Sequence, residues 1–252
     1  MPLPASPLPD FTSSRFLRAH VEDTLAFYRP VAFDPDGGFF HYFRDDGSVY
    51  ERAHRHLVSA SRFVFNWANA HRLHGGAAWR DWAAHALAQL ERDFRTAAGD
   101  YVWTIRDGRV DDARIMAYGQ AFVLLAKAHA HRIGLCDAAA VRQVFDRMEA
   151  VFFEPACGAY ADERSAAGQL VSYRGQNANM HMCEACIAAF EATGEARYLE
   201  RARLLAGTFA LQGAARSGGQ IWEHYRQDWQ VDWDYNRDHP GDIFKPWGFQ
   251  TG

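Results

Sequence analysis

Long apolar runs are missing from the sequence: none approaches the roughly 20 residues that a membrane-spanning helix needs. The opening residues, MPLPASPLPDFTSS, have neither the basic start nor the apolar stretch of a signal peptide. An excess of one charge is also missing, because 27 Lys and Arg and 31 Asp and Glu are interspersed, for a net charge of -4. No basic face or tail recommends nucleic acid as a partner. We therefore expect a cytoplasmic protein that binds neither membrane nor nucleic acid.

Cysteine is scarce, with four residues at Cys136, Cys157, Cys183 and Cys186. Their number and spacing do not form the disulfide framework of a small secreted domain. Cys183 and Cys186 make a CxxC, but no second CxxC or His pair lies at zinc-finger spacing. Because the surrounding segment has a helical pattern, we expect plain buried thiols.

Aromatic residues are abundant instead, at 14% of the chain, with 8 Trp, and there are also 12 His. Such side chains are common where ring-shaped polar ligands such as sugars stack and form hydrogen bonds. They also fill gaps between packed helices. Composition alone does not separate the two interpretations.

Helical periodicity dominates the chain, with apolar residues recurring at three- and four-residue spacing. It predicts helices near 14–29, 53–74, 78–97, 112–133, 138–153, 178–192 and 196–211. Strand-like runs are short and lie only between these segments.

These short runs repeat, each with a glycine followed by aromatic or β-branched residues. The glycines are Gly37, Gly99, Gly158 and Gly218, separated by 62, 59 and 60 residues, with two helices between successive runs. A fixed period indicates a repeat architecture. Helix pairs at this spacing form either an open array or a closed ring whose loops build a pocket at one end. A six-hairpin ring would need about 360 residues at this period, whereas this chain supplies about four helical hairpins.

Four stretches resemble one enzyme family, and they occur in the family's order. They are YRGQNANMHMCEACIAAFEATGEARYLERA at 173–202, ARIMAYGQAFVLLA at 113–126, HLVSASRFVFNWANA at 56–70 and WEHYRQDWQVDWDYNRDHPGDIFKPWGFQTG at 222–252. Together they resemble the N-acylglucosamine 2-epimerase superfamily, especially its mannose isomerase and aldose–ketose isomerase branch.

The resemblance implies an all-α fold, an (α/α)6 toroid, here a single domain over 1–252 without its C-terminal hairpins. It also implies that the two main acid/base histidines of the family fall beyond Gly252. We therefore expect the 252-residue chain alone to show little or no isomerase activity. Four hairpins without ring closure would expose an apolar flank, so self-association into a homo-oligomer stays open.

The implied reaction converts mannose, or a related free aldose, to its ketose through a cis-enediolate. It needs a base, a group that stabilises the enediolate oxygens and a pocket that opens the sugar ring. Histidine is the natural base because it titrates near neutral pH. This route demands no metal and no other cofactor.

Among the residues present, the resemblance implies that His181 lies near the anomeric end of the sugar in a supporting role. The alternative is a half-buried helix histidine bonded to a backbone carbonyl. Asn177, four residues earlier, would share its helix face and bind a sugar hydroxyl. Its alternative role is a helix N-cap, for which Asn179 competes.

Three further residues are candidates for binding substrate. Arg62 resembles the family's substrate arginine, and its five donors suit a developing enediolate; a structural ion pair is the alternative. Tyr118 would donate to a sugar hydroxyl or belong to the core. Glu223 follows a Gly-Gly turn and would point into the pocket or lie on a surface hairpin. The run 234–239 is expected to fix its loop.

Other functions stay open. A 2-epimerase of the N-acylglucosamine or cellobiose type would use the same proton abstraction. A toroid glycoside hydrolase would need two carboxylates about 6.5–9.5 Å apart, and the candidates are Asp111, Asp112, Glu184, Glu223 and Asp234. An inactive sugar-binding remnant would follow if Gly252 were the true C-terminus.

Overall fold

The computed structural model describes residues 8–239, 242 and 245–249. Its helices are α1 (Ser14–Tyr28), α2 (Leu57–His74), α3 (Ala77–Gln89), α4 (Ala117–Arg132), α5 (Ala138–Val151), α6 (Gln176–Thr193), α7 (Ala196–Ala206) and α8 (Ala214–Arg216). Two π-helical turns, η1 (Leu90–Phe94) and η2 (Gly207–Gly213), extend α3 and α7.

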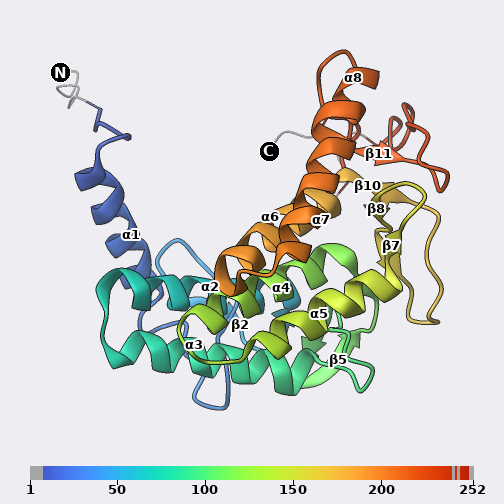
Figure 1. Cartoon of the computed structure of the whole chain (residues 1–252). Helices are drawn as coiled ribbons and strands as arrows, with labels where there is room; N and C mark the ends of the chain where they lie inside the picture. Colours follow the sequence, from blue (N-terminus) through green and yellow to red (C-terminus); the bar gives the residue numbers. More distant parts are fainter. Residues whose placement is uncertain (1–7, 240–241, 243–244, 250–252) are drawn as a thin grey trace.

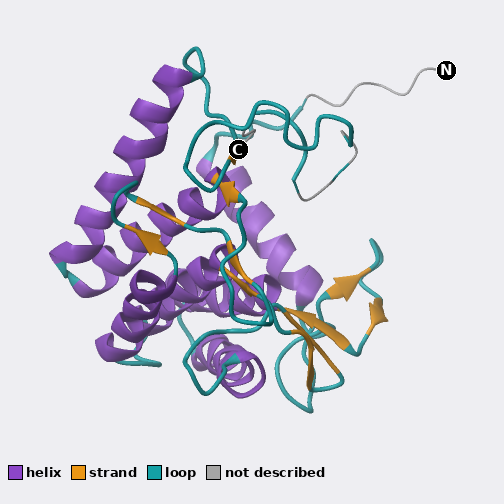
Figure 2. Cartoon of the chain, turned by 90° about the vertical axis from the view of Figure 1, so that its right-hand side faces the viewer, coloured by secondary structure: helices purple, strands orange, loops and turns teal. Residues whose placement is uncertain are grey.

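The strands are short and lie between the helices, as expected. They are β1 (Tyr42–Phe43), β2 (Val49–Glu51), β3 (His54–His56), β4 (Thr104–Arg106), β5 (Arg109–Asp112), β6 (Ile115–Met116), β7 (Phe153–Glu154), β8 (Ala159–Tyr160), β9 (Glu163–Arg164), β10 (Arg174–Gly175) and β11 (His224–Tyr225). They gather with the long loops on one side of the helices (Figure 2).

The helices form a curved double layer. In the inner layer α2 packs on α4, and α4 packs on α6, while α3, α5 and α7 each pack outside the inner helix that precedes them. Helix α1 stands apart at one end of the arc and buries none of its residues, whereas α7 and α8 lie at the other end (Figure 1). Among the described helices, none combines the length and hydropathy of a membrane span.

The middle inner helix, α4, is buried along nearly its whole length because both its neighbours and the outer layer cover it. A helix enclosed in this way has to be apolar or small-sided all round. Gly119 shows how tightly it is held, because a Cβ there would lie 2.7 Å from Leu57 Cδ2 and 3.1 Å from the Trp103 ring. Close packing of small residues thus draws the inner helices together.

The two helices predicted to begin at 53 and 112 begin later, at Leu57 and Ala117, and strands precede them. Strand β3 pairs with β4, and β6 pairs with β9, both antiparallel. Partners more than 45 residues away therefore hold these segments extended, which local periodicity does not reveal. The bounds of α1 and α5 agree with the prediction to within two residues.

The repeat glycines lie in hairpins, of which the first follows α1 and the next two follow the outer-layer segments η1 and α5. The same backbone bond closes the first three: Phe40 N to Ala32 O at 2.8 Å, Val102 N to Phe94 O at 2.9 Å, and Ala161 N to Phe152 O at 2.8 Å. The repeat glycine has a positive φ in each, at +136° in Gly37, +87° in Gly99 and +65° in Gly158. Such angles favour residues without a Cβ.

Buried amides then fasten the second and third hairpins to the next inner helix. Gln120 of α4 accepts from the backbone N–H of Tyr101 and donates to its carbonyl, at 3.0 and 2.8 Å. Asn179 of α6 does the same for Tyr160, at 2.8 and 3.0 Å. The alternative role of Asn177 or Asn179 as the N-cap of α6 is wrong, since the cap residue is Gly175, which makes no side-chain bond.

The cysteines are all free thiols. The expectation of buried thiols is confirmed for Cys186, whereas Cys136 and Cys183 are half-buried and Cys157 is exposed. Within the described part of the chain, no group of three His, Cys, Asp or Glu side chains is arranged to hold a metal ion.

Candidate active site

A cavity of about 750 Å³ opens at the end of the inner layer where α2, α4 and α6 begin. Its lining residues are Tyr42, His54, His56, Val58, Ser59, Trp103, Thr104, Asp112, Met116, Tyr118, Asp162, Tyr173, Asn177, Ala178, Glu223 and Lys245. Most of these side chains are aromatic or carry a hydroxyl, amide, carboxyl or imidazole group.

Interlocking of successive loops builds this cavity. The first N–H of each inner helix donates to a carbonyl of the following loop: Leu57 to Trp103 at 3.0 Å, Ala117 to Asp162 at 2.8 Å, and Gln176 to Glu223 at 2.9 Å. Trp103, Asp162 and Glu223 are therefore equivalent residues of three repeats. Each bond places the side chain of its loop residue beside a helix N-terminus.

Tyr118 and Asn177 are the second residues of α4 and α6, so they too are equivalent, and both line the cavity. Burial raises the pKa of Tyr118, so its hydroxyl stays protonated at neutral pH. The backbone N–H of Asn177 lies 3.1–3.2 Å from the two carboxyl oxygens of Glu223. Two predicted substrate-binding residues, Asn177 and Glu223, are thus in direct contact.

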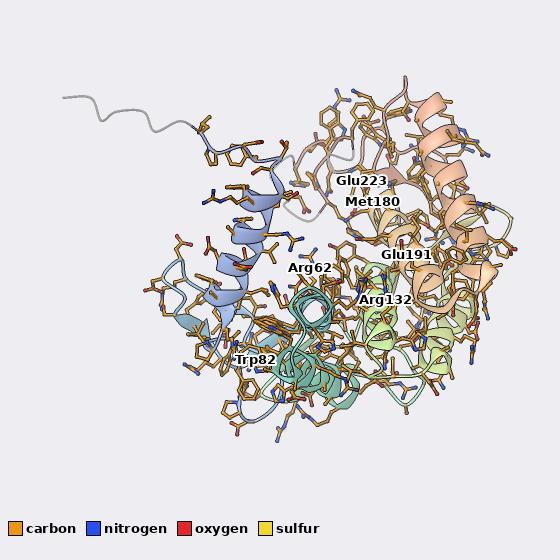
Figure 3. All side chains as sticks on the ribbon, turned by 60° about the vertical axis from the view of Figure 1, so that its left-hand side comes forward. Arg62, Trp82, Arg132, Met180, Glu191 and Glu223 are labelled. Carbon is orange, nitrogen blue, oxygen red and sulfur yellow. The ribbon has the colours of Figure 1, made fainter. Side chains whose placement is uncertain are left out.

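One helical turn further on, three equivalent residues form a row across the inner layer. The Arg62 guanidinium lies 4.8 Å from the centre of the Phe122 ring, and the His181 ring lies 4.7 Å from Phe122 on the other side. Arg62 is exposed and forms no ion pair with any described residue. Figure 3 shows it projecting from α2 on the side of the molecule where Glu223 and Met180 lie. The structural ion pair considered for Arg62 is therefore wrong.

His181 is positioned by its own helix and by α4. Its ring meets that of Tyr118 edge-on, with centres 5.0 Å apart, and its Nδ1 lies 2.9 Å from Oε2 of Glu184. The alternative of a backbone carbonyl partner is thus wrong. The bond to His181 holds the pKa of Glu184 below its ordinary value, so Glu184 is an ionised acceptor and Nδ1 carries a hydrogen. In the neutral ring this leaves Nε2 as an acceptor.

Glu223 has the most perturbed carboxyl of the cavity. Burial, with the negative charge of Asp162, raises its pKa to about 8, against the opposing effects of the Asn177 N–H, Lys245 and Tyr173. The Lys245 ammonium lies 3.2 Å from Asp162 Oδ2 and 3.7 Å from the centre of the Tyr173 ring. Glu223 is therefore mostly a neutral acid at pH 7, able to donate a hydrogen bond. Glu223 lines the cavity, as the sequence predicts for a residue that points into the pocket.

The sequence interpretation missed Trp103, Asp162, Tyr173 and Lys245. A signal for the first two existed in the repeat, because they occupy the loop position that Glu223 occupies two and one repeats later. Tyr173 precedes β10, and Lys245 reaches the cavity from the loop after β11, so no local pattern points to them.

The loop before Lys245 is held by its own polar residues. Asn236 donates to Asp242 Oδ2 at 3.2 Å and to the Lys245 carbonyl at 2.9 Å, with φ at +55°. Arg237 pairs with Asp234 at 2.9 Å. These contacts agree with the expectation that the run 234–239 fixes its loop.

The carboxylates considered for a hydrolase fall into two groups. Asp112 and Glu223 line the cavity. The others are not among the lining residues and pair with neighbouring side chains: Asp111 with His54 at 3.6 Å, Glu184 with His181, and Asp234 with Arg237.

A curved double layer of helical hairpins, with a polar cavity built by the loops at one end, is part of an α/α toroid. The chain belongs to the N-acylglucosamine 2-epimerase (GlcNAc 2-epimerase) family, which it matches over residues 38–252. It is 47% identical over 247 residues to a D-mannose isomerase of Marinomonas mediterranea, covering 97% of this chain and 63% of that protein.

Solved structures agree with this assignment. A crystal structure of a D-mannose isomerase, 45% identical, superposes with a TM-score of 0.94 over 96% of this chain and 63% of that one. A cellobiose 2-epimerase from Bacillus thermoamylovorans B4167 shares the fold, with a TM-score of 0.79 at 18% identity, over 90% of this chain and 64% of that one. The chain thus spans about two thirds of the length of these proteins. The predicted all-α toroid fold is confirmed.

Proposed function

We propose that this protein interconverts D-mannose, or a related free aldose, and the corresponding ketose by proton transfer through a cis-enediolate. One observation carries the proposal. A cavity of hydroxyl, amide and carboxyl groups lies at the N-termini of the inner helices, in a chain 47% identical to a D-mannose isomerase over 97% of its length.

The cavity suits an uncharged sugar. Asp112, Asp162 and Glu223 line it together with Lys245, and the described lining includes no arginine, since Arg62 lies one helical turn further along α2. A phosphate group on the substrate would meet the carboxyl groups of Asp112 and Asp162 and be repelled, whereas sugar hydroxyls find both donors and acceptors. The geometry therefore favours a free aldose over a sugar phosphate.

Each predicted site residue has a role in this proposal. Tyr118 and the neutral acid of Glu223 donate to sugar hydroxyls, and Asn177 binds a hydroxyl beside them. The exposed guanidinium of Arg62 stabilises negative charge on the enediolate oxygens, because it carries five N–H donors in a planar fork. His181, held by Glu184, supports the reaction by polarising an oxygen or helping to open the sugar ring.

Deuterium incorporation distinguishes the candidate reactions. The protein, produced from its complete reading frame, is incubated with D-mannose in deuterium oxide and followed by NMR. Ketose with deuterium at C1 is the result expected for the isomerase. An aldose inverted and deuterated at C2 would instead identify an epimerase. Release of reducing ends from an oligosaccharide would identify a hydrolase. Unchanged, undeuterated mannose would refute the isomerase proposal.

We also propose a cytoplasmic location and a monosaccharide as the binding partner. The four free thiols support a reducing compartment, and the interspersed charges offer no surface for nucleic acid. Self-association into a homo-oligomer stays a prediction, and light scattering after gel filtration measures it directly.

A further inference from the structure

His56 occupies the N-cap of α2. The ring Nδ1 of His56 accepts a hydrogen bond from the backbone N–H of Val58 at 3.2 Å. The backbone N–H of His56 donates to Nδ1 of His41 at 2.8 Å. A ring nitrogen that accepts a hydrogen bond carries no hydrogen, so the hydrogen of the neutral ring is on Nε2. The helix cap thereby determines the tautomer of His56.

The same ring lines the cavity that holds Tyr118 and Asn177. One side of the ring is occupied by Trp103, whose ring centre lies 4.2 Å away at an interplanar angle of 70°. Among the described residues, the one hydrogen bond of the His56 side chain is the one at Nδ1, and none reaches Nε2. Since Nδ1 is used by the helix, Nε2–H is the polar group that the ring presents to the cavity.

The imidazole is neutral at physiological pH. Burial is the main cause that lowers its pKa to about 4, with contributions from His54 and Arg62, while Asp112 opposes them. A neutral imidazole donates a hydrogen bond without acting as a strong acid.

The other repeats show that the fold does not require an imidazole here. Met116 and Gly175 occupy the equivalent cap positions of α4 and α6, and neither makes a side-chain cap bond. Both helices nevertheless begin at the equivalent residue and bond to the next loop. Capping therefore does not explain the histidine, whereas a donor facing the substrate does.

We propose that His56 is a catalytic residue whose Nε2–H donates a hydrogen bond to a substrate oxygen, the carbonyl oxygen of the open-chain aldose and then the enediolate. This inference rests on the proposed isomerase function. No bond to His56 forms or breaks, and its proton stays on Nε2 while other groups move the substrate proton. Arg62, six residues along the same helix, adds the positive charge that a neutral ring lacks.

Two substitutions separate the donor from the cap. The variant His56→Asn keeps an acceptor for the Val58 N–H, and Asn is among the best capping residues. This variant lacks the donor that Nε2 supplies. In the variant His56→Gln, the side-chain amide N–H reaches about as far into the cavity as Nε2–H does. Gln is, however, a poor N-cap residue. We expect His56→Asn to lower kcat about 10²-fold with an unchanged Tm. We expect His56→Gln to recover activity to within about tenfold of wild type despite a lower Tm.

A purely structural role predicts the opposite order, because activity would follow stability. His56→Gln would then be the less active variant, and His56→Asn would match the wild type. Either finding would overturn the proposed contact with substrate.

A second measurement does not depend on turnover. In ¹⁵N-labelled protein we expect the His56 ring to be the neutral Nε2–H tautomer between about pH 5 and 8, and saturating D-mannitol, an open-chain polyol, to shift the Nε2–H resonance. An unshifted resonance in the mannitol-saturated protein, or a proton on Nδ1, would refute the inference even in an active isomerase. Absence of mannose conversion by the wild type would refute the proposed function instead. A protein that binds no sugar would refute both.

Discussion

The substitution Glu223→Gln tests the electrostatics of the cavity. The carboxyl of Glu223 is half-buried beside Asp162, and burial is the main cause that raises its pKa to about 8. Glutamine keeps an oxygen that can accept from the Asn177 N–H, and it carries no charge. It therefore resembles the protonated acid in shape and polarity, while it cannot lose a proton.

The sign of the effect follows from proton binding. Between about pH 4.5 and 8 the folded protein keeps a proton on Glu223 that the unfolded chain has released. The free energy of unfolding therefore falls as pH rises through this window and levels off above it. The difference between 4.5 and about 8 corresponds to on the order of 5 kcal/mol as an upper limit. The variant lacks this loss, so it should be the more stable protein at high pH.

Urea unfolding at about pH 5, 7 and 9 measures both proteins across the window. We expect the stability difference in favour of Glu223→Gln to grow by several kcal/mol from the lowest to the highest pH. Glu191→Gln is the matched control, because this surface carboxylate pairs with Arg132 at 3.1 Å (Figure 3) and should contribute about 0–1 kcal/mol without this pH dependence. Parallel curves for wild type and Glu223→Gln would show that the carboxyl is ionised in the folded protein.

Three further substitutions test packing and the site. Asn179→Ala leaves the buried N–H and C=O of Tyr160 without partners, and we expect a loss of roughly 2–4 kcal/mol in urea unfolding; a loss below about 0.5 kcal/mol would contradict that account. Gly119→Ala brings a Cβ within 2.7 Å of Leu57. We expect overpacking to lower the free energy of unfolding by about 1–3 kcal/mol, more than the gain in helix propensity returns. A raised Tm would show instead that the helices move apart freely. Arg62→Gln should lower kcat for mannose about 10²-fold with stability changed by less than about 0.5 kcal/mol, since the side chain is exposed; an equal loss of stability would indicate a structural role.

The helices and their repeat were predictable because their signals are local. Apolar spacing along each helix and a glycine at each outer-helix turn are properties of neighbouring residues, so α1 and α5 were placed to within two residues. The starts of α2 and α4 were not predictable in this way. There, strand pairing with residues more than 45 positions away competes with a helical pattern and prevails.

The residues of the candidate site also differ in how far the sequence alone predicts their positions. His181 and Asn177 share one helix face, so their spacing already places them together, and Glu223 follows a recognisable turn. Asp162, Tyr173 and Lys245 come from three different loops, and only the folded chain brings them to Glu223. The raised pKa of Glu223 depends on this packing of three loops, because a carboxyl in an isolated turn is fully hydrated.

His56 shows the limit of local reasoning most clearly. The sequence shows a histidine near the start of a predicted helical segment, and a capping role can be inferred from these neighbouring residues alone. Its tautomer follows from the cap once the helix is known to begin at Leu57. Its position in the cavity depends on Trp103 and Tyr118, which belong to the next repeat. Periodicity within one chain segment thus determines helices and turns, whereas contacts between repeats set the protonation and surroundings of the groups that meet the substrate.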